Sequence, residues 1–174
     1  MAAPNQRESA LAQQNGAYEP QRQYHWILRI SDLPGSDVLE LSLRAGNLPT
    51  DANEEIVIPM LNANVYVAGK QTVEAISFTY NDYVDVDTMG VIGRWRRLVY
   101  NPETQEQGYA ANYKKTASLI LYGPDYSVER VWELQGLWPM SATNGAISYE
   151  SSEIVQIEVS FRYDRAIQRS GWVA

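Results

Sequence analysis

The sequence lacks several residue types on which common functional sites depend. It contains no cysteine, which excludes a disulfide scaffold, a zinc–thiolate site and a cysteine nucleophile. Its only histidine, His25, lies within a predicted strand and has no partner motif for acid–base catalysis. No apolar run approaches the length of a membrane span, and no cationic segment followed by an apolar segment opens the chain. We therefore expect a soluble protein that is made inside the cell.

Basic residues are scarce in one part of the chain. The formal net charge is −7, and residues 36–90 contain nine acidic residues but only two basic ones, Arg44 and Lys70. Acidic and basic residues balance before and after this block, so the whole negative excess lies within it. Because contacts with phosphate need lysine and arginine, the block argues against affinity for nucleic acid. A solvated acidic face that aids solubility is the simplest alternative.

Familiar catalytic and ligand-binding motifs are also missing. The sequence has no GxGxxG, P-loop or GxSxG motif. Asp82, Asp85 and Asp87 lack the glycine and the closing glutamate of an EF-hand loop. Glu129 and Glu133 would lie about 13 Å apart along one strand, which is too far for the acid pair of a glycosidase. We therefore expect no enzymatic activity, no cofactor and no metal site.

What the chain does contain is period-two alternation of apolar and polar residues, which predicts half-buried strands. The expected strands cover residues 24–30, 37–44, 56–60, 64–67, 72–80, 116–122, 126–134 and 153–163. The first two should form a hairpin, and residues 68–70 should form the turn between the fourth and the fifth. Residues 45–55 are expected to be an irregular loop.

One helix is expected at about residues 87–100, where apolar residues recur at helical spacing. Asp87 is the expected N-cap, and Asn101 followed by Pro102 ends the helix. The predicted fold class is therefore mainly β, an antiparallel β-sandwich or barrel with one packed α-helix. We expect a single domain at residues 23–166. A polar N-terminal arm at 1–22 should lie between subunits, and a tail at 167–174 should follow the domain.

Two segments resemble a known family. Residues 93–123 (GRWRRLVYNPETQEQGYAANYKKTASLILYG) resemble the part of contractile-tail bacteriophage tube proteins in which a helix leads into the next strand. Residues 128–166 are similar to the C-terminal block of that family, with its Gly-x-Trp-Pro corner, Ile-Ser-Tyr segment and closing Phe-x-Tyr-Asp. Here these are residues 136–139, 147–149 and 161–164. The first half of the chain resembles the family only in the order of its elements.

The resemblance implies a structural subunit of a tail tube. In this family, β-sandwich subunits form hexameric rings, which stack into a hollow tube with a β-lined channel for DNA ejection. The implied partners are further copies of the chain, a surrounding sheath protein, and baseplate and tail-terminator proteins at the tube ends. The tape-measure protein and DNA would pass through the lumen without tight binding. The implied location is the virion, after synthesis in the host cytoplasm.

An acidic channel would repel phosphate and let DNA slide. The candidate lumen-facing residues are Glu40, Glu74, Glu129, Glu133, Gln156 and Glu158. Arg94 and Arg97 share the polar face of the predicted helix and are candidates for an outer surface that docks an acidic partner. A solvated helix end, where the helix dipole favours cations, is the simpler interpretation of these arginines.

Three other functions stay open. The tubes of R-type bacteriocins and of type VI secretion share the fold that the resemblance implies, so the chain could be the inner tube of such an injection machine. A carbohydrate-binding β-sandwich module is a different class of protein, because five tryptophans and twelve tyrosines could stack on sugars. A small β-fold enzyme is disfavoured by the missing motifs.

Overall fold

A long bent strand organises the computed structural model, which describes residues 20–150 and 152–170. This strand, β9 (Val128–Asn144), pairs along its first part with β8 (Lys115–Tyr122) and β11 (Arg165–Ser170). Along its last part it pairs with β10 (Gln156–Arg162). β9 therefore belongs to two sheets.

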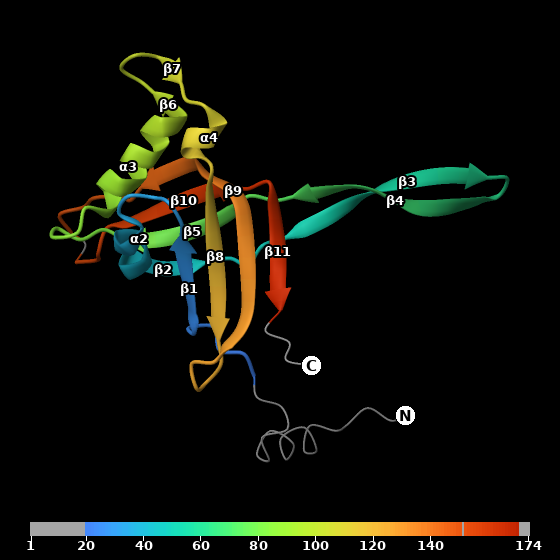
Figure 1. The fold of residues 1–174 in the computed structure, drawn as a ribbon, viewed down its shortest axis with the longest axis horizontal. Helices are drawn as coiled ribbons and strands as arrows, with labels where there is room; N and C mark the ends of the chain where they lie inside the picture. Colours follow the sequence, from blue (N-terminus) through green and yellow to red (C-terminus); the bar gives the residue numbers. More distant parts are fainter. Residues whose placement is uncertain (1–19, 151, 171–174) are drawn as a thin grey trace.

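The two sheets are antiparallel, and their strands cross at a steep angle (Figure 1). The first sheet has the order β1 (Trp26–Ile30), β8, β9, β11. The second has the order β9, β10, β5 (Ile76–Asn81), β2 (Leu43–Gly46). The predicted mainly β, antiparallel fold is confirmed.

The bend of β9 lies at Gly136, whose φ of 70° is a conformation that glycine adopts without steric cost. Pro139 follows and pairs with Phe161 of β10, where the register shifts. The sequence predicted a strand at 126–134, which would end before the corner of residues 136–139. In the structure the strand continues through this corner and passes from the first sheet into the second.

The hydrophobic core lies between the inward faces of the two sheets and a helix. Every second residue of β5 and β10 is buried, which the regular alternation in the sequence predicted for β10. The large side chains buried in this core include Leu28, Ile76, Phe78, Tyr80, Trp95, Leu119, Leu134, Ile157 and Phe161. Burial of these apolar groups is the main force that holds the two sheets together.

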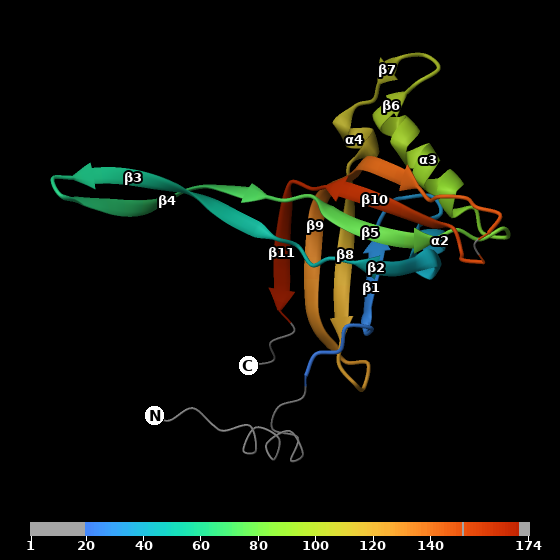
Figure 2. The same cartoon turned by 180° about the vertical axis from the view of Figure 1, so that it is seen from behind.

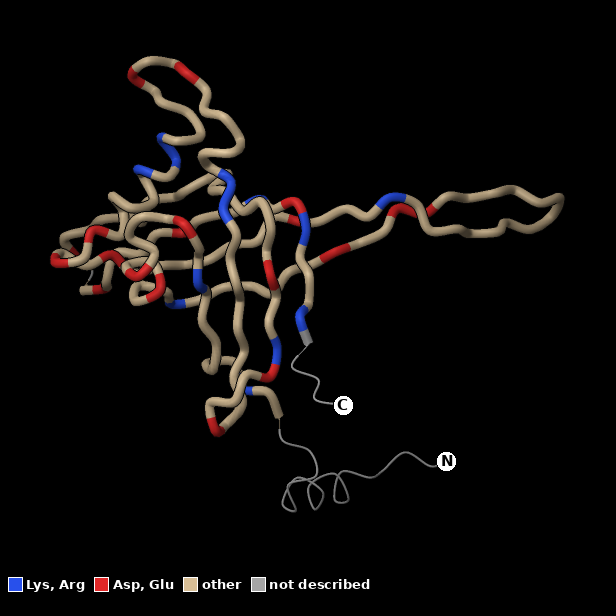
Figure 3. Tube along the Cα trace, in the orientation of Figure 1, with Lys and Arg blue, Asp and Glu red and all other residues tan. Residues whose placement is uncertain are grey.

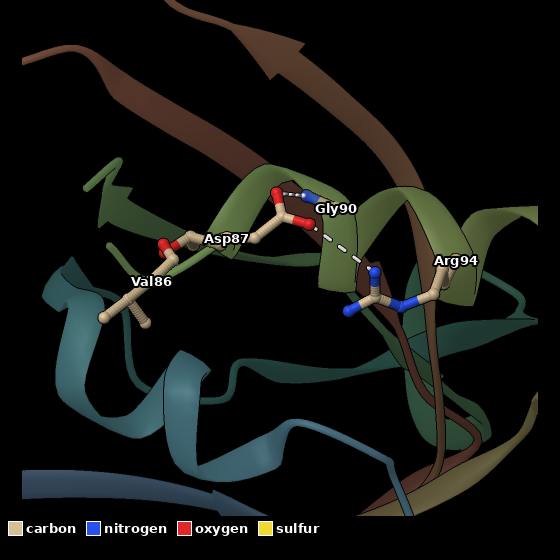
Figure 4. A network of polar contacts seen from close by, with 5 residues as sticks. Val86, Asp87, Gly90 and Arg94 are labelled. Carbon is tan, nitrogen blue, oxygen red and sulfur yellow. Dashed lines mark hydrogen bonds and ion pairs between the residues drawn. The ribbon is translucent and has the colours of Figure 1, made fainter. Parts of the chain in front are cut away.

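The expected helix is present as α3 (Thr88–Val99). Asp87 caps its N-terminus, because Oδ1 of Asp87 accepts a hydrogen bond of 2.8 Å from the backbone N–H of Gly90 (Figure 4). α3 covers the inward side of the second sheet, where the ring of Trp95 lies 5.5 Å from that of Phe161. The helix therefore covers the core on the buried side of the second sheet, and the opposite side of that sheet stays open.

The strand predicted at residues 37–44 was wrong for most of its length. Residues Ser36–Ser42 form a helix, α2, and only β2 continues as a strand. The leucines at 39, 41 and 43 alternate, but Leu39 is buried while Leu41 is 76% exposed. Leu39 and Ser42 are three residues apart and share the buried side of the helix. The expected hairpin is absent, because β1 pairs with the distant β8.

Two long strands form a ribbon that projects from the body of the molecule (Figures 1 and 2). β3 (Asp51–Met60) pairs with β4 (Ala63–Val73), and the chain turns at Leu61, which has a φ of 47°. The loop predicted at 45–55 is limited to residues 47–50, between β2 and β3, and the turn predicted at 68–70 was wrong. Several short segments of this region contain polar residues or glycine and could form a turn. Only the pairing of β3 with β4 decides which of them does.

Short elements connect α3 to the first sheet. β6 (Tyr100–Asn101) and β7 (Glu106–Gln107) form a small hairpin, and α4 (Ala110–Tyr113) precedes β8. Neither α2 nor α4 was expected from the sequence. Trp95 of α3 donates a hydrogen bond of 2.7 Å from Nε1 to the backbone oxygen of Tyr113, which ties α4 to the larger helix.

The last strand extends beyond the C-terminal boundary that we expected for the domain. β11 crosses the boundary expected at residue 166, so residues 167–170 belong to the first sheet. Most of the expected arm at 1–22 lies outside the described residues. Of its described part, the Gln21 amide donates a hydrogen bond of 3.0 Å to the backbone oxygen of Tyr122. Among the helices of the described ranges, none is both long and apolar enough to span a membrane.

Candidate channel face and assembly surfaces

Short polar side chains cover the outward face of the second sheet. In β5 and β10 they alternate with the buried residues, and β9 adds two more beyond its bend. We call this surface the polar face; its members are Ser77, Thr79, Asn81, Ser141, Thr143, Gln156, Glu158, Ser160 and Arg162. Ser77 and Ser160 interact across the sheet, with their Oγ atoms 3.0 Å apart. Only Glu158 and Arg162 are charged, so the polar face is dominated by hydroxyl and amide groups.

The six candidate lumen residues do not share one surface. Gln156 and Glu158 both lie on β10 within the polar face, where they pair with Asn81 and Thr79 of β5. Glu40 lies on α2, where its carboxylate is 3.4 Å from the guanidinium of Arg29. Glu74 lies in the link between β4 and β5. The sequence did not show that these residues belong to different surfaces, because neither α2 nor the projecting ribbon was expected.

Glu129 and Glu133 lie on the first sheet, and polar groups contact both carboxylates. Glu133 accepts a hydrogen bond of 2.7 Å from Gln135 Nε2 and one of 3.0 Å from Arg169 Nε. The hydrogen bond from Gln135 and then that from Arg169 lower the pKa of the Glu133 carboxyl, although desolvation opposes them. Glu129 accepts a hydrogen bond of 3.0 Å from the Ser127 hydroxyl.

The outward face of the first sheet has a different character from the polar face. It combines half-buried aliphatic side chains with cations. Its aliphatic members are Ile27, Ile120, Val131 and Ile167, and its charged members are Arg29, Arg165, Arg169 and Glu133. Arg169 forms an ion pair with Glu133, and Arg29 forms one with Glu40 of α2. Arginines bind phosphate, and aliphatic groups prefer a protein partner to water. Of the two outward sheet faces, the polar face is therefore the better surface for free passage of a polyanion.

Arg94 and Arg97 lie on the exposed side of α3, each with 65% of its side chain accessible. Arg94 reaches back to Asp87, with Nη1 of the arginine 3.5 Å from Oδ2 of the carboxylate (Figure 4). Arg97 lies 3.8 Å from Glu103. Because α3 covers the inward side of the second sheet, these arginines and the polar face lie on opposite sides of that sheet.

The second sheet has two outer strands that are available for pairing with another chain. β2 pairs only with β5, and the last part of β9 pairs only with β10, among the strands that the structure describes. Unpaired backbone N–H and C=O groups of such strands can extend a sheet from one molecule to the next. Within residues 20–150 and 152–170, no three His, Asp or Glu side chains are grouped to hold a metal ion.

Part of the polar face could be recognised in the sequence. The alternation within residues 153–163 identifies Gln156, Glu158, Ser160 and Arg162 as one face of a strand. Ser77 and Thr79 also alternate with buried residues, but the sequence gives no sign that their strand pairs with β10. The register of the two strands supplies that information.

The chain is similar in sequence to a phage protein. No protein-family model matches the chain. A protein of Serratia phage KSP90 named "Tail tube protein" is 25% identical over 179 residues, which cover 96% of this chain and 97% of the phage protein.

Solved structures show the same fold at lower sequence identity. A chain of the anti-feeding prophage cap, a tube-terminating cap, superposes with a TM-score of 0.71 at 14% identity, over 88% of this chain and 93% of that chain. A chain of the sheath/tube terminator of PVC, an extracellular contractile injection system, superposes with a TM-score of 0.70 at 14% identity, over 88% and 99%. The resemblance predicted from the motifs is therefore confirmed: in sequence this chain is similar to a phage tail tube protein, and it has the fold of chains from contractile injection systems.

Proposed function

We propose that the chain is the structural subunit of the tail tube of a contractile phage. Six copies form a ring, and the rings stack into a hollow conduit for DNA ejection, with the polar face towards the channel. One observation carries this proposal. A chain similar to a phage tail tube protein presents a sheet face on which hydroxyl and amide groups predominate, in a sheet with two open outer strands.

The polar face suits a channel because it gives DNA little to bind. Each released counterion strengthens the binding of a protein to DNA, so affinity grows with the number of lysines and arginines that reach phosphate. The polar face offers one arginine, Arg162, and one acid, Glu158. This supports Gln156 and Glu158 as lumen residues. The other four candidates lie elsewhere, so the channel wall in this proposal is nearly neutral.

The acidic residues that give residues 36–90 their negative excess lie outside the polar face. These residues are spread over α2, the β3–β4 ribbon and the segment before α3 (Figure 3). They do not form a single channel-lining row. Their charge acts instead on subunit contacts and on the solubility of the free subunit.

The open strands and α3 supply the remaining contacts of a tube. β2 of one subunit and the last part of β9 of the next extend the second sheet around the ring. The exposed side of α3, with Arg94 and Arg97, then faces outward. This side is the proposed docking surface for an acidic segment of the sheath protein.

Electron microscopy of the purified protein is the first test of assembly. Six-fold rings or tubes are the expected result. A protein that stays monomeric at high concentration and binds oligosaccharide would contradict the proposal and favour a carbohydrate-binding module. Tubes found in particles that carry no DNA would favour the inner tube of a bacteriocin or type VI-like machine.

Cysteine labelling then tests which face lines the channel, because the natural chain has no cysteine. Glu158→Cys in assembled tubes should react with a small maleimide but not with a maleimide on a large polymer. Arg94→Cys, on the exposed side of α3, should react with both reagents. Rapid polymer labelling of Glu158→Cys in intact tubes would show that the polar face is not in the lumen.

A further inference from the structure

The last residue of β9 is an asparagine that is followed by a glycine. Asn144 ends the strand with its side chain exposed, and Gly145 begins the link to β10. Among the described residues, no other asparagine precedes a glycine. Asparagine is a thermolabile residue, and it reacts fastest before glycine, because a residue without a Cβ leaves its backbone nitrogen accessible and its dihedral angles free. Asn144 is therefore the described asparagine that is most open to spontaneous modification.

The sheet holds this position on one side only. Asn144 forms the last pair between β9 and β10, with Ile157. Beyond it, residues 145–150 and 152–155 contain no helix or strand. The N–H of Gly145 donates no hydrogen bond to another backbone group in either described range. The nitrogen that has to react is thus not held by the sheet.

The fold also shows why a glycine stands at position 145. A Cβ atom there would lie 2.4 Å from the backbone oxygen and 3.1 Å from the backbone nitrogen of Gln156. Both atoms belong to the main chain of β10, so they cannot move aside without disturbing the pairing of that strand. The close approach of the two segments therefore requires glycine, and the same glycine makes Asn144 reactive.

The reaction needs only water as a co-reactant. The backbone nitrogen of Gly145 gives up its proton and bonds to Cγ of Asn144, and the side-chain amide leaves as ammonia, which gives a five-membered imide. Water then opens one of two C–N bonds of the ring. Opening at Cγ gives aspartate. Opening at the main-chain carbonyl gives isoaspartate, in which the backbone runs through the side chain and is one carbon longer. Either product adds one negative charge to the chain.

We propose that Asn144 is a self-modifying site of the free subunit, and that its conversion removes the subunit from assembly. The second part rests on the proposed function, in which the last part of β9 pairs with β2 of the next subunit. A longer backbone at Asn144 shifts the N–H and C=O groups with which the outer edge of β9 pairs. In an assembled tube, pairing on both sides of β9 holds Asn144 and should slow the reaction by about tenfold or more. Assembly thus selects recently made subunits.

Peptide mapping by mass spectrometry measures the reaction at Asn144 directly. The full chain is aged at mildly alkaline pH as the free folded subunit, as assembled tubes and as the chain unfolded in urea. The unfolded chain gives the intrinsic rate, and the free subunit should convert within about tenfold of it, because the end of β9 opens locally. Asn64 is the internal control, since it precedes the β-branched Val65 within β4 and should stay unmodified in the folded subunit. Asn15 also precedes a glycine and is followed on its own peptide.

Two variants then test the effect on assembly. Aged subunits should enter new tubes in a lower proportion than fresh ones. Asn144→Gln keeps an amide but cannot form the five-membered imide, so it should enter tubes equally well before and after ageing. Asn144→Asp carries the added charge on a backbone of normal length and should assemble better than the isoaspartate form.

The outcomes separate this inference from the proposed function. Conversion of Asn144 in the free subunit that is no faster than conversion of Asn64, or no faster than in tubes, would overturn the proposal. Equal entry of aged and fresh subunits into tubes would overturn its assembly step. The absence of any ring or tube from fresh protein would contradict the proposed function and the assembly step, whereas conversion of Asn144 in the free subunit would still support the modification itself.

Discussion

Gly136→Ala should destabilise the subunit, because the bend of β9 depends on a backbone conformation that alanine adopts poorly. Gly136 has a φ of 70°, and β9 passes there from the first sheet into the second. A Cβ atom at this position would lie 2.2 Å from Oδ2 and 2.7 Å from Cγ of Asp164. Lys114 Nζ contacts both carboxylate oxygens of Asp164 at 2.8 Å, so the carboxylate cannot move without disturbing this ion pair.

Two terms set the expected size of the effect. A left-handed conformation costs a residue with a Cβ roughly 1–2 kcal/mol. The ion pair contributes at most about 1 kcal/mol, since the side chains of Lys114 and Asp164 are 32% and 56% exposed and water screens their attraction. We therefore expect Gly136→Ala to lower the free energy of unfolding by about 2 kcal/mol. For a chain of this length, that loss lowers the melting temperature by roughly 4–8 °C.

Urea unfolding of the unassembled subunit, followed by tryptophan fluorescence, measures this loss. Gly93→Ala is the matched control, because it makes the same substitution inside α3, where a Cβ meets no other atom within 4 Å. Alanine should stabilise that helix by roughly 0.5–1 kcal/mol. If Gly136→Ala proves as stable as the unmodified protein while Gly93→Ala gains stability, the argument from positive φ and close contact is refuted.

Two further substitutions test single side chains. Tyr80→Phe should leave stability unchanged or raise it by about 1 kcal/mol, because the buried Tyr80 hydroxyl has no hydrogen-bond partner among the described residues; a clear loss in urea unfolding would reveal a partner. Glu133→Gln should flatten the fall of stability in acid. Hydrogen bonds from Gln135 and Arg169 lower the pKa of Glu133, so its contribution is present above the ordinary glutamate pKa of about 4.3 and is lost as the pH falls below it. Equal acid slopes for both proteins would contradict this role of Glu133.

Local patterns in the sequence identified several elements correctly. α3 was predictable because apolar residues recur at helical spacing, Asp87 can cap the N-terminus, and Pro102 follows the end. β10 was predictable because apolar and polar residues alternate regularly along it, so that one face is apolar and the other is polar. In each case the residues that decide the structure lie close together in the chain.

Other elements depend on contacts that the sequence does not display. The alternating leucines of residues 39–43 fit a strand as well as a helix, and packing on α3 and β1 favours the helix. The turn of the β3–β4 ribbon lies at Leu61 because the strands pair in that register, although Gly69 looked like a turn residue. β11 was missed because six residues near the chain end reveal a strand only when β9 lies beside them.

The sequence by itself determined which residue types and motifs the chain contains and which it lacks. Missing cysteine and catalytic motifs, the alternating strands and the motifs of residues 128–166 all follow from residue identities and short spacings. Only the tertiary structure decided which surfaces exist. Gln156 and Glu158 of β10 lie beside Asn81 and Thr79 of β5 in the second sheet. Glu129 and Glu133 lie in the first sheet, because β9 passes from the first sheet into the second only after them, at Gly136. A strand places its side chains by a period of two, but the face that it joins depends on its partners, and those partners are distant in the chain.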